Sequence, residues 1–248
     1  MRARYANDGY LVMDALVSAE MCAELRERVD ELIHAEAVPN GIVMQVEPRV
    51  ERGERRAASR AHAIRKIDGL AVNDPLFRAL TAHGAILDVV KALLGPNLKL
   101  FRNSLLLKPP SVGSAKGWHQ DSPYWPIQPM ALCSLWLALD DATTENGCMV
   151  VLPGQHMRGP LAHQAVCDDY VIEDGLIDPA MGVAVPMPAG SGLFFHSLLP
   201  HYTAPNTSSH WRRAMVLSFM SADSRYTGDG PGPVYAHVAG ETLEGCVR

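Results

Sequence analysis

The first third of the chain spaces its apolar residues as α-helices do. From Ala19 to about His34 they recur every three or four positions, with Glu and Arg between them. Ser18 precedes this segment and suits an N-cap, because its hydroxyl can accept a hydrogen bond from a free backbone N–H of the first turn. The pattern predicts a short strand at residues 9–13 and a helix over 19–34 whose buried face holds Leu25, Val29, Leu32 and Ile33.

Two more helices are predicted between Asp74 and Gly95. Asp74 followed by Pro75 is typical of an N-cap and first turn, and Gly95-Pro96 is typical of a helix end. The apolar positions between these signals again have helical spacing: Leu76, Leu80, Ile86, Val89, Val90, Leu93 and Leu94.

Residues 36–66 interrupt this periodicity. The segment interleaves arginines with glutamates and has no apolar stripe of either period. We expect a mobile segment or a poorly packed helix that presents a solvated charged face. Recognition of an anionic substrate such as a phosphate, a carboxylate or a CoA ester is the alternative.

From Leu98 onward the pattern becomes that of strands. Residues 98–103 alternate in character, and further short candidates, separated by Gly, Pro and Asn turns, lie at 132–139, 148–152, 192–196 and 214–220. This order predicts an α+β, mainly β fold: a double-sheet jelly roll with the N-terminal helices packed on one sheet. We expect a single domain, 1–248, with a strand, helices and a lid-like segment in 1–97, the jelly-roll core in 98–222 and a loop-like tail in 223–248.

Composition and charge exclude several classes of protein. A net charge of −5 and a pI near 6.0 argue against a nucleic-acid partner. No apolar run reaches the roughly 18 residues of a membrane span, and the start lacks the apolar core of a signal peptide. The five cysteines are scattered without zinc-type spacing, which favours reduced thiols and a cytoplasmic location. The sequence does not define the oligomeric state.

The candidate chemistry lies at Trp118-His119-Gln120-Asp121 and at the distant His201. A His-x-Asp pair with a remote histidine is the composition of a 2-His-1-carboxylate facial triad, which holds Fe(II) and leaves positions open for oxygen chemistry. Residues i and i+2 of a strand share a face, so His119 and Asp121 can reach one metal from a strand end. Gln120 would then face the other way, unless the strand bends.

A single His-x-Asp pair arises readily by chance in a chain with 10 histidines, so the surrounding residues decide its weight. His196 is an alternative ligand five residues before His201. It ends an apolar segment, Leu193-Phe194-Phe195, and is therefore expected to be a core histidine.

Several ordered motifs flank these residues. They are Leu106-Leu107-Lys108-Pro109-Pro110, the 118–121 segment, Asp140-Asp141-Ala142-Thr143, Glu145-Asn146-Gly147-Cys148, Val151-Leu152-Pro153-Gly154-Gln155-His156, His201, Pro205-Asn206-Thr207-Ser208 and Arg212-Arg213-Ala214. Together with Asp8-Gly9-Tyr10, they make the chain resemble the phytanoyl-CoA dioxygenase family of Fe(II)/2-oxoglutarate-dependent oxygenases. The resemblance covers most of the chain and is weakest at 36–66 and after 222.

The resemblance implies a double-stranded β-helix, which is a cupin-like jelly roll, and a set of site residues. The catalytic iron ligands would be His119, Asp121 and His201. Arg212 would grip the far carboxylate of 2-oxoglutarate, since a guanidinium can bind a carboxylate through two parallel hydrogen bonds. Arg213 is the alternative, because neighbours in a strand face opposite ways. Lys108, Gln120 and Thr203 would be further cosubstrate contacts, with a plain surface lysine as the other interpretation of Lys108.

Four aromatic residues near the ligands are candidate substrate contacts or core residues: Trp118, Tyr124, Trp125 and Tyr202. Tyr202 departs from the family pattern, which commonly has glycine and then a small residue after the distal histidine. Its phenol would either narrow the pocket or project away from it.

The resemblance implies hydroxylation of an aliphatic C–H bond of a small molecule by O2 and 2-oxoglutarate, with release of succinate and CO2. Desaturation, cyclisation or epimerisation of a natural-product intermediate is the alternative with the same cofactors. A non-catalytic jelly-roll binding protein and a zinc-dependent cupin-like hydrolase or isomerase are rivals from other classes, although a zinc enzyme would have no use for Arg212. Asp121 argues against halogenation, because related halogenases have a small residue at this position.

Overall fold

A computed structural model of the chain describes residues 1–167 and 169–248. Its α-helices are α1 (Arg2–Asp8), α2 (Ala19–His34), α3 (Pro48–Glu51), α4 (Leu70–Asn73), α5 (Pro75–Thr81) and α6 (Gly84–Leu94). Its 3-10 helices are η1 (Ala61–Ala63), η2 (Ser122–Tyr124), η3 (Gln155–Arg158) and η4 (Pro179–Met181).

The strands are mostly short and pair antiparallel. They are β1 (Tyr10–Met13), β2 (Val43–Val46), β3 (Ile64–Asp68), β4 (Leu98–Lys108), β5 (Lys116–His119), β6 (Ile127–Gln128), β7 (Cys133–Ala138), β8 (Met149–Val151), β9 (His163–Val166), β10 (Asp169–Ile172), β11 (Val183–Val185), β12 (Gly192–His196), β13 (His201–Thr203), β14 (Arg212–Ser221), β15 (Arg225–Tyr226) and β16 (Ala236–Ala239).

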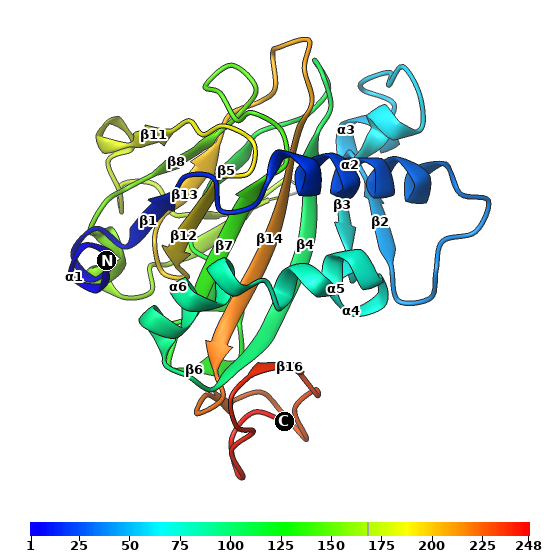
Figure 1. Ribbon diagram of the computed structural model, residues 1–248. Helices are drawn as coiled ribbons and strands as arrows, with labels where there is room; N and C mark the ends of the chain where they lie inside the picture. Colours follow the sequence, from blue (N-terminus) through cyan, green and yellow to red (C-terminus); the bar gives the residue numbers. More distant parts are fainter. Residues whose placement is uncertain (168) are drawn as a thin grey trace.

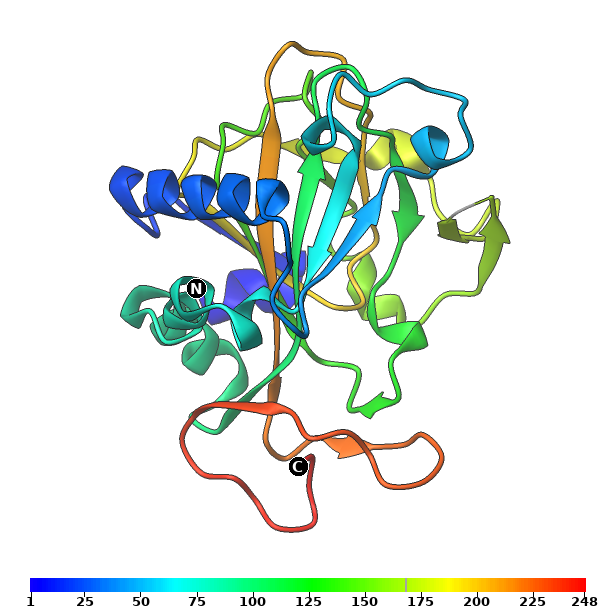
Figure 2. The same cartoon turned by 90° about the vertical axis from the view of Figure 1, so that its right-hand side faces the viewer.

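Two sheets form the body of the protein. The larger has the order β1-β12-β7-β14-β4-β3-β2, with β16 paired to β4, and the smaller has the order β11-β8-β13-β5. The helices α2, α5 and α6 cross one face of the large sheet, and the small sheet lies on its other side (Figures 1 and 2). The chain is therefore mainly β with helices on one side, as the α+β prediction requires.

Strand alternation divides the large sheet into two faces with different partners. On β7, Leu135 and Leu137 pack in the core shared with the helices, whereas Trp136 and Ala138 pack in the core between the sheets. On β14, Leu217 belongs to the helix side, and its neighbours of opposite parity face inward. Every second residue of these strands thus points into the space between the sheets, where the candidate site lies.

The helix predictions are confirmed at the level of single residues. The helix α2 spans Ala19–His34, and the Ser18 hydroxyl accepts a hydrogen bond from the Met21 backbone N–H at 3.2 Å. The Asp74 carboxylate caps α5 by accepting bonds from the N–H groups of Leu76 and Phe77. The helix α6 ends at Leu94, directly before Gly95. The short helix α1 was not predicted.

The expectations for residues 36–66 and for the tail were wrong in part. The first segment is not a poorly packed helix, because β2 and β3 form a hairpin that extends the large sheet beside β4. Ile64 and Ile67 anchor this hairpin in the helix-side core. In the tail, β16 pairs with the beginning of β4. Among the described residues, no helix is long and apolar enough to cross a membrane.

Candidate active site

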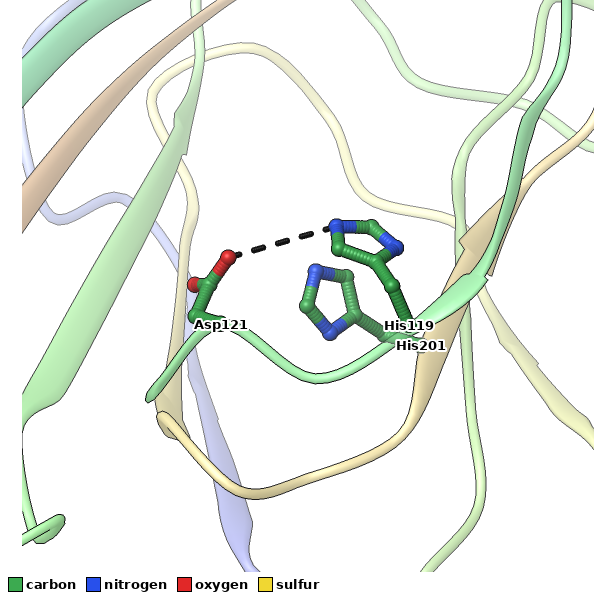
Figure 3. Close-up of side chains that lie close together, drawn as sticks. All are labelled: His119, Asp121 and His201. Atoms are coloured by element: carbon green, nitrogen blue, oxygen red, sulfur yellow. Dashed lines mark ion pairs between the residues drawn. The ribbon is translucent and has the colours of Figure 1, made fainter. Parts of the chain in front are cut away.

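The three predicted metal ligands converge at one end of the small sheet. His119 ends β5, His201 begins β13, and the two residues are direct partners in the antiparallel register, with ring centroids 4.0 Å apart. The chain leaves the strand after His119, so Asp121 reaches the same point from the turn before η2. One ligand atom from each residue lies within 4.8 Å of the others, and His119 Nε2 is 3.9 Å from Asp121 Oδ1 (Figure 3).

Hydrogen bonds and burial prepare both imidazoles for a metal. His119 Nδ1 donates to the Gly117 carbonyl at 2.8 Å and His201 Nδ1 donates to the Leu199 carbonyl at 2.9 Å, which leaves each Nε2 with a free lone pair. Burial, followed by the neighbouring His201, lowers the pKa of His119 well below its usual value. Burial also lowers the pKa of His201. Both rings are therefore neutral near pH 7, the form that a metal binds.

The Asp121 carboxylate is buried, and hydrogen bonds on the side away from the two histidines fix its orientation. The Ser134 hydroxyl donates to Asp121 Oδ2 at 3.4 Å and contacts the Ser218 hydroxyl at 2.9 Å. The Asp121 backbone N–H donates to the Ser197 carbonyl at 2.9 Å. These contacts hold Oδ2 away from the histidines and direct Oδ1 toward them.

The triad borders a cavity of about 320 Å3 between the two sheets. The large sheet supplies the deep wall, the small sheet supplies the histidine wall, and η2, the β2–β3 hairpin and β10 surround the opening. The cavity is lined from these elements by residues that include Gln45, Glu47, Arg65, Lys66, Arg102, Lys108, Lys116, His119, Asp121, Tyr124, Trp125, Trp136, Asp169, Tyr170, His201, Thr203 and Arg212.

Two buried donors in the deep wall have no acceptor among the described residues. Arg212 is 2% exposed, its Nε has no partner there, and its Nη1 donates a long hydrogen bond of 3.4 Å to the Leu106 carbonyl. Burial lowers the pKa of its guanidinium to about 10, so it still carries a charge at pH 7. The Arg212 Cζ atom lies 5.4 Å from the ring centroid of Trp136, whose indole N–H also has no partner within the described part of the chain. A bound carboxylate would satisfy both groups.

Arg213, the alternative to Arg212, faces the opposite side of β14. Its Nε and Nη2 donate to the Asp140 carboxylate at 2.8 and 2.9 Å, and its Nη1 lies 3.5 Å from Asp30 of α2. Strand alternation thus directs Arg212 to the cavity and Arg213 to the helices.

The other predicted cosubstrate residues lie at the cavity, but two already have their hydrogen bonds satisfied. Lys108 Nζ donates to the carbonyls of Ser114, Thr203 and Ala204, and burial, together with Arg212, lowers its pKa to about 6. The buried Gln120 side chain donates to two carbonyls, of Gly159 and Leu198, and accepts from the Leu161 N–H. These bonds give Lys108 and Gln120 a structural role, whereas the Thr203 side chain is buried in the cavity wall.

The four aromatic candidates separate into two pairs. Tyr124 and Trp125 line the cavity. Trp118 and Tyr202 stack on each other, with centroids 5.5 Å apart, and neither is among the described residues that line it. Tyr202 therefore projects away from the site, which is one of the two outcomes considered for it.

His196 is partly buried beside His156 and is not part of the His119–Asp121–His201 cluster. Its ring is 5.1 Å from that of His156, its Nδ1 accepts from the Leu198 N–H at 3.1 Å, and burial lowers its pKa to about 4.

Trp136 and Arg102 are two site residues that the sequence did not reveal. Both belong to strands that pack in the body of the protein, and neither stands in a motif with the ligands. The only signal in the sequence was the alternation of residues along each strand. Trp136 lies within the apolar run 132–139, and Arg102 is an even number of residues away from Lys108 on β4. That signal becomes usable only when the pairing of the strands is known.

Comparison with known proteins agrees with this geometry. Residues 5–214 match the family model described as phytanoyl-CoA dioxygenase (PhyH). The peroxisomal phytanoyl-CoA dioxygenase of Mus musculus is 30% identical over 259 residues, which cover 98% of this chain and 74% of the mouse protein.

Solved structures share the fold. The apo form of the non-heme monooxygenase ThoJ has a TM-score of 0.75 at 23% identity, covering 97% of this chain and 84% of that one. The epimerase SnoN, in complex with Fe3+, alpha ketoglutarate and nogalamycin RO, has a TM-score of 0.71 at 22% identity, covering 97% and 95%. The likeness confirms the cupin-like, jelly-roll prediction.

Fold and site together define a non-heme, 2-oxoglutarate-dependent dioxygenase. More particularly, the chain belongs to the phytanoyl-CoA dioxygenase family. The donor set fits the cofactors of this class, because two neutral imidazoles and one carboxylate suit Fe(II) and an unpaired buried guanidinium suits a dicarboxylate cosubstrate.

Proposed function

We propose that this protein hydroxylates an aliphatic C–H bond of a small molecule, with Fe(II) and 2-oxoglutarate as its cofactor and cosubstrate. The observation that carries the proposal is the joint presence, in one cavity, of the converging triad and the unpaired Arg212 guanidinium. A zinc hydrolase would gain nothing from a buried arginine without a partner, and a protein without turnover would have no reason to keep both features.

In this proposal His119, Asp121 and His201 hold the iron through the Nε2 atoms and Oδ1. Arg212 and the Trp136 indole N–H bind the far carboxylate of 2-oxoglutarate, and Thr203 lies beside it. When bound, iron, 2-oxoglutarate and O2 would together supply an oxidant strong enough to attack an unactivated C–H bond, with succinate and CO2 as by-products.

The contribution of the chain is positioning and shielding. The Nδ1 bonds to main-chain carbonyls fix the orientation of both imidazoles, and Ser134 fixes the orientation of the carboxylate. Residues of the β2–β3 hairpin, η2 and β10 line the cavity together with the two sheets. Tyr124 and Trp125 give the opening an apolar wall that suits an organic substrate.

Succinate formation tests the proposal directly. Wild-type protein with Fe(II), 2-oxoglutarate and O2 should form succinate, slowly without substrate and faster with a productive one, and the product should gain one oxygen atom. A product that loses two hydrogen atoms, or changes configuration at unchanged mass, would replace hydroxylation by one of the alternative outcomes. Iron-loaded protein that forms no succinate under any condition would contradict the enzymatic assignment.

A further inference from the structure

Six lysine and arginine side chains are among the described residues that line the cavity, and three of them, all lysines, lie within 3.2 Å of an acceptor oxygen. Lys66 Nζ lies 3.0 Å from Asp68 Oδ2, and Lys116 Nζ lies 2.6 Å from Asp169 Oδ1. Lys108 donates to three main-chain carbonyls. Arg212 lies in the deep wall and is assigned to the cosubstrate. Two cationic residues of the described lining, Arg65 and Arg102, remain to be explained.

Arg102 lies beside the triad with unused hydrogen-bonding capacity. Its Nε is buried and has no acceptor among the described residues, and its Nη1 forms a long ion pair of 4.0 Å with Asp121 Oδ1, which is beyond hydrogen-bonding distance. Its Cζ lies 5.4 Å from the ring centroid of Trp125, so the guanidinium is held over an aromatic face.

Arg102 and Arg212, whose buried Nε–H groups both lack an acceptor among the described residues, differ in depth. The Arg212 side chain is among the most buried of the protein, whereas the Arg102 side chain is 34% exposed and lies over the Trp125 ring. Arg102 is thus the more solvent-accessible of the two arginines. A fixed guanidinium with a free Nε–H and free Nη groups matches a carboxylate or another planar pair of oxyanion oxygens.

We propose that Arg102 binds an anionic group of the substrate next to the metal, so that the enzyme selects carboxylates or similar oxyanions over neutral molecules of the same shape. This inference rests on the proposed function and deepens it, because it names a substrate class and the residue that selects it. The same chemistry has a second source, the 1-carboxylate of 2-oxoglutarate, and the experiment separates the two.

The test uses protein loaded anaerobically with Fe(II) and 2-oxoglutarate. Hexanoate and hexanamide, which share a shape and differ in charge, are titrated while the visible charge-transfer band of the Fe(II)–2-oxoglutarate complex is followed. The proteins are wild type, Arg102→Gln, Arg102→Lys and the matched control Arg65→Gln, whose residue lines the same cavity from β3.

We expect wild type to bind hexanoate at least about tenfold more tightly than hexanamide, the effect of a charge-assisted hydrogen bond. The preference should fall to about twofold or less in Arg102→Gln, survive in part in Arg102→Lys and persist in Arg65→Gln. The affinity for 2-oxoglutarate itself should stay within about threefold of wild type in Arg102→Gln.

Several results would overturn the inference. The first two are equal affinity of wild type for hexanoate and hexanamide, and binding of neither. The third is a loss of the preference for hexanoate in Arg65→Gln as large as that in Arg102→Gln, which would assign the preference to the overall positive charge of the cavity. A tenfold higher Kd for 2-oxoglutarate in Arg102→Gln would show that Arg102 binds the cosubstrate. Absence of the band in wild type would contradict the proposed function itself, whereas an intact band without Arg102-dependent selectivity contradicts this inference alone.

Discussion

Replacement of Arg212 by glutamine separates cosubstrate binding from folding. In the structure its guanidinium is buried, has an unpaired Nε and makes a single long bond to a carbonyl. Loss of one partner of a buried charge pair costs about 2–5 kcal/mol in binding. We therefore expect Arg212→Gln to raise the Kd for 2-oxoglutarate by a factor between about 30 and about 4000.

Without cosubstrate the same substitution should not destabilise the protein. Burial of the unpaired guanidinium is unfavourable, as its lowered pKa shows, so a neutral side chain should leave the urea midpoint of the apoprotein unchanged or raise it. The assay is the anaerobic titration of Fe(II)-loaded protein with 2-oxoglutarate, accompanied by urea denaturation of the apoprotein.

Arg213→Gln is the matched control, because Arg213 is the next residue of β14 and pairs with Asp140 on the helix side. It should lower stability and leave the affinity for 2-oxoglutarate within about twofold of wild type. The reasoning is refuted if Arg212→Gln binds 2-oxoglutarate as wild type does, or if both variants weaken binding equally.

Four further substitutions or conditions have defined outcomes. Asp121→Ala should weaken Fe(II) binding more than about 100-fold, beyond the range of outer-shell changes, and abolish succinate formation without unfolding the protein; full 2-oxoglutarate-dependent turnover in this variant would exclude the triad. Trp136→Phe keeps an aromatic side chain, although a smaller one, and removes the indole N–H, so the Kd for 2-oxoglutarate measured by titration should rise about fivefold; an unchanged Kd would exclude the contact. Lys108→Met should lower the urea midpoint but change 2-oxoglutarate binding far less than the Arg212 variant does; an equal effect would return Lys108 to the cosubstrate. Burial lowers the pKa of His196 to about 4, so between pH about 6.5 and about 4 the unfolded chain binds a proton at this residue that the folded chain does not. The free energy of unfolding of the apoprotein, measured with urea, should therefore decrease as the pH is lowered through this window. A flat profile would show that the histidine is not held neutral.

Local signals in the sequence were sufficient for the helices α2, α5 and α6, although not for the short helix α1. Ser18 before an apolar stripe and Asp74 before Pro75 mark helix starts through contacts that form within a single turn. The β2–β3 hairpin was missed for the opposite reason. The pairing of β3 with β4 joins residues that are far apart in the chain. In the sequence, the many charged residues of this segment also make the two buried residues Ile64 and Ile67 too few to give an apolar pattern.

The site could be predicted where a motif carried it and not elsewhere. The family motifs pointed to the triad and to Arg212, which the structure brings to one cavity. Proximity in sequence was a poor guide to the remaining residues. Trp118 and Tyr202 adjoin ligands yet lie outside the described lining, whereas Trp136 enters it from another strand. Which side of a strand faces the metal depends on how the two sheets pair, and single-chain periodicity does not encode this pairing.

The central claim is that one cavity holds iron through the triad and 2-oxoglutarate through Arg212. Anaerobic addition of Fe(II) and then 2-oxoglutarate to metal-free protein tests it most directly. The account predicts a visible metal-to-ligand charge-transfer band that saturates at about one 2-oxoglutarate per iron, since one triad provides one chelation site. Iron that binds at the triad but gives no band on addition of 2-oxoglutarate would contradict it.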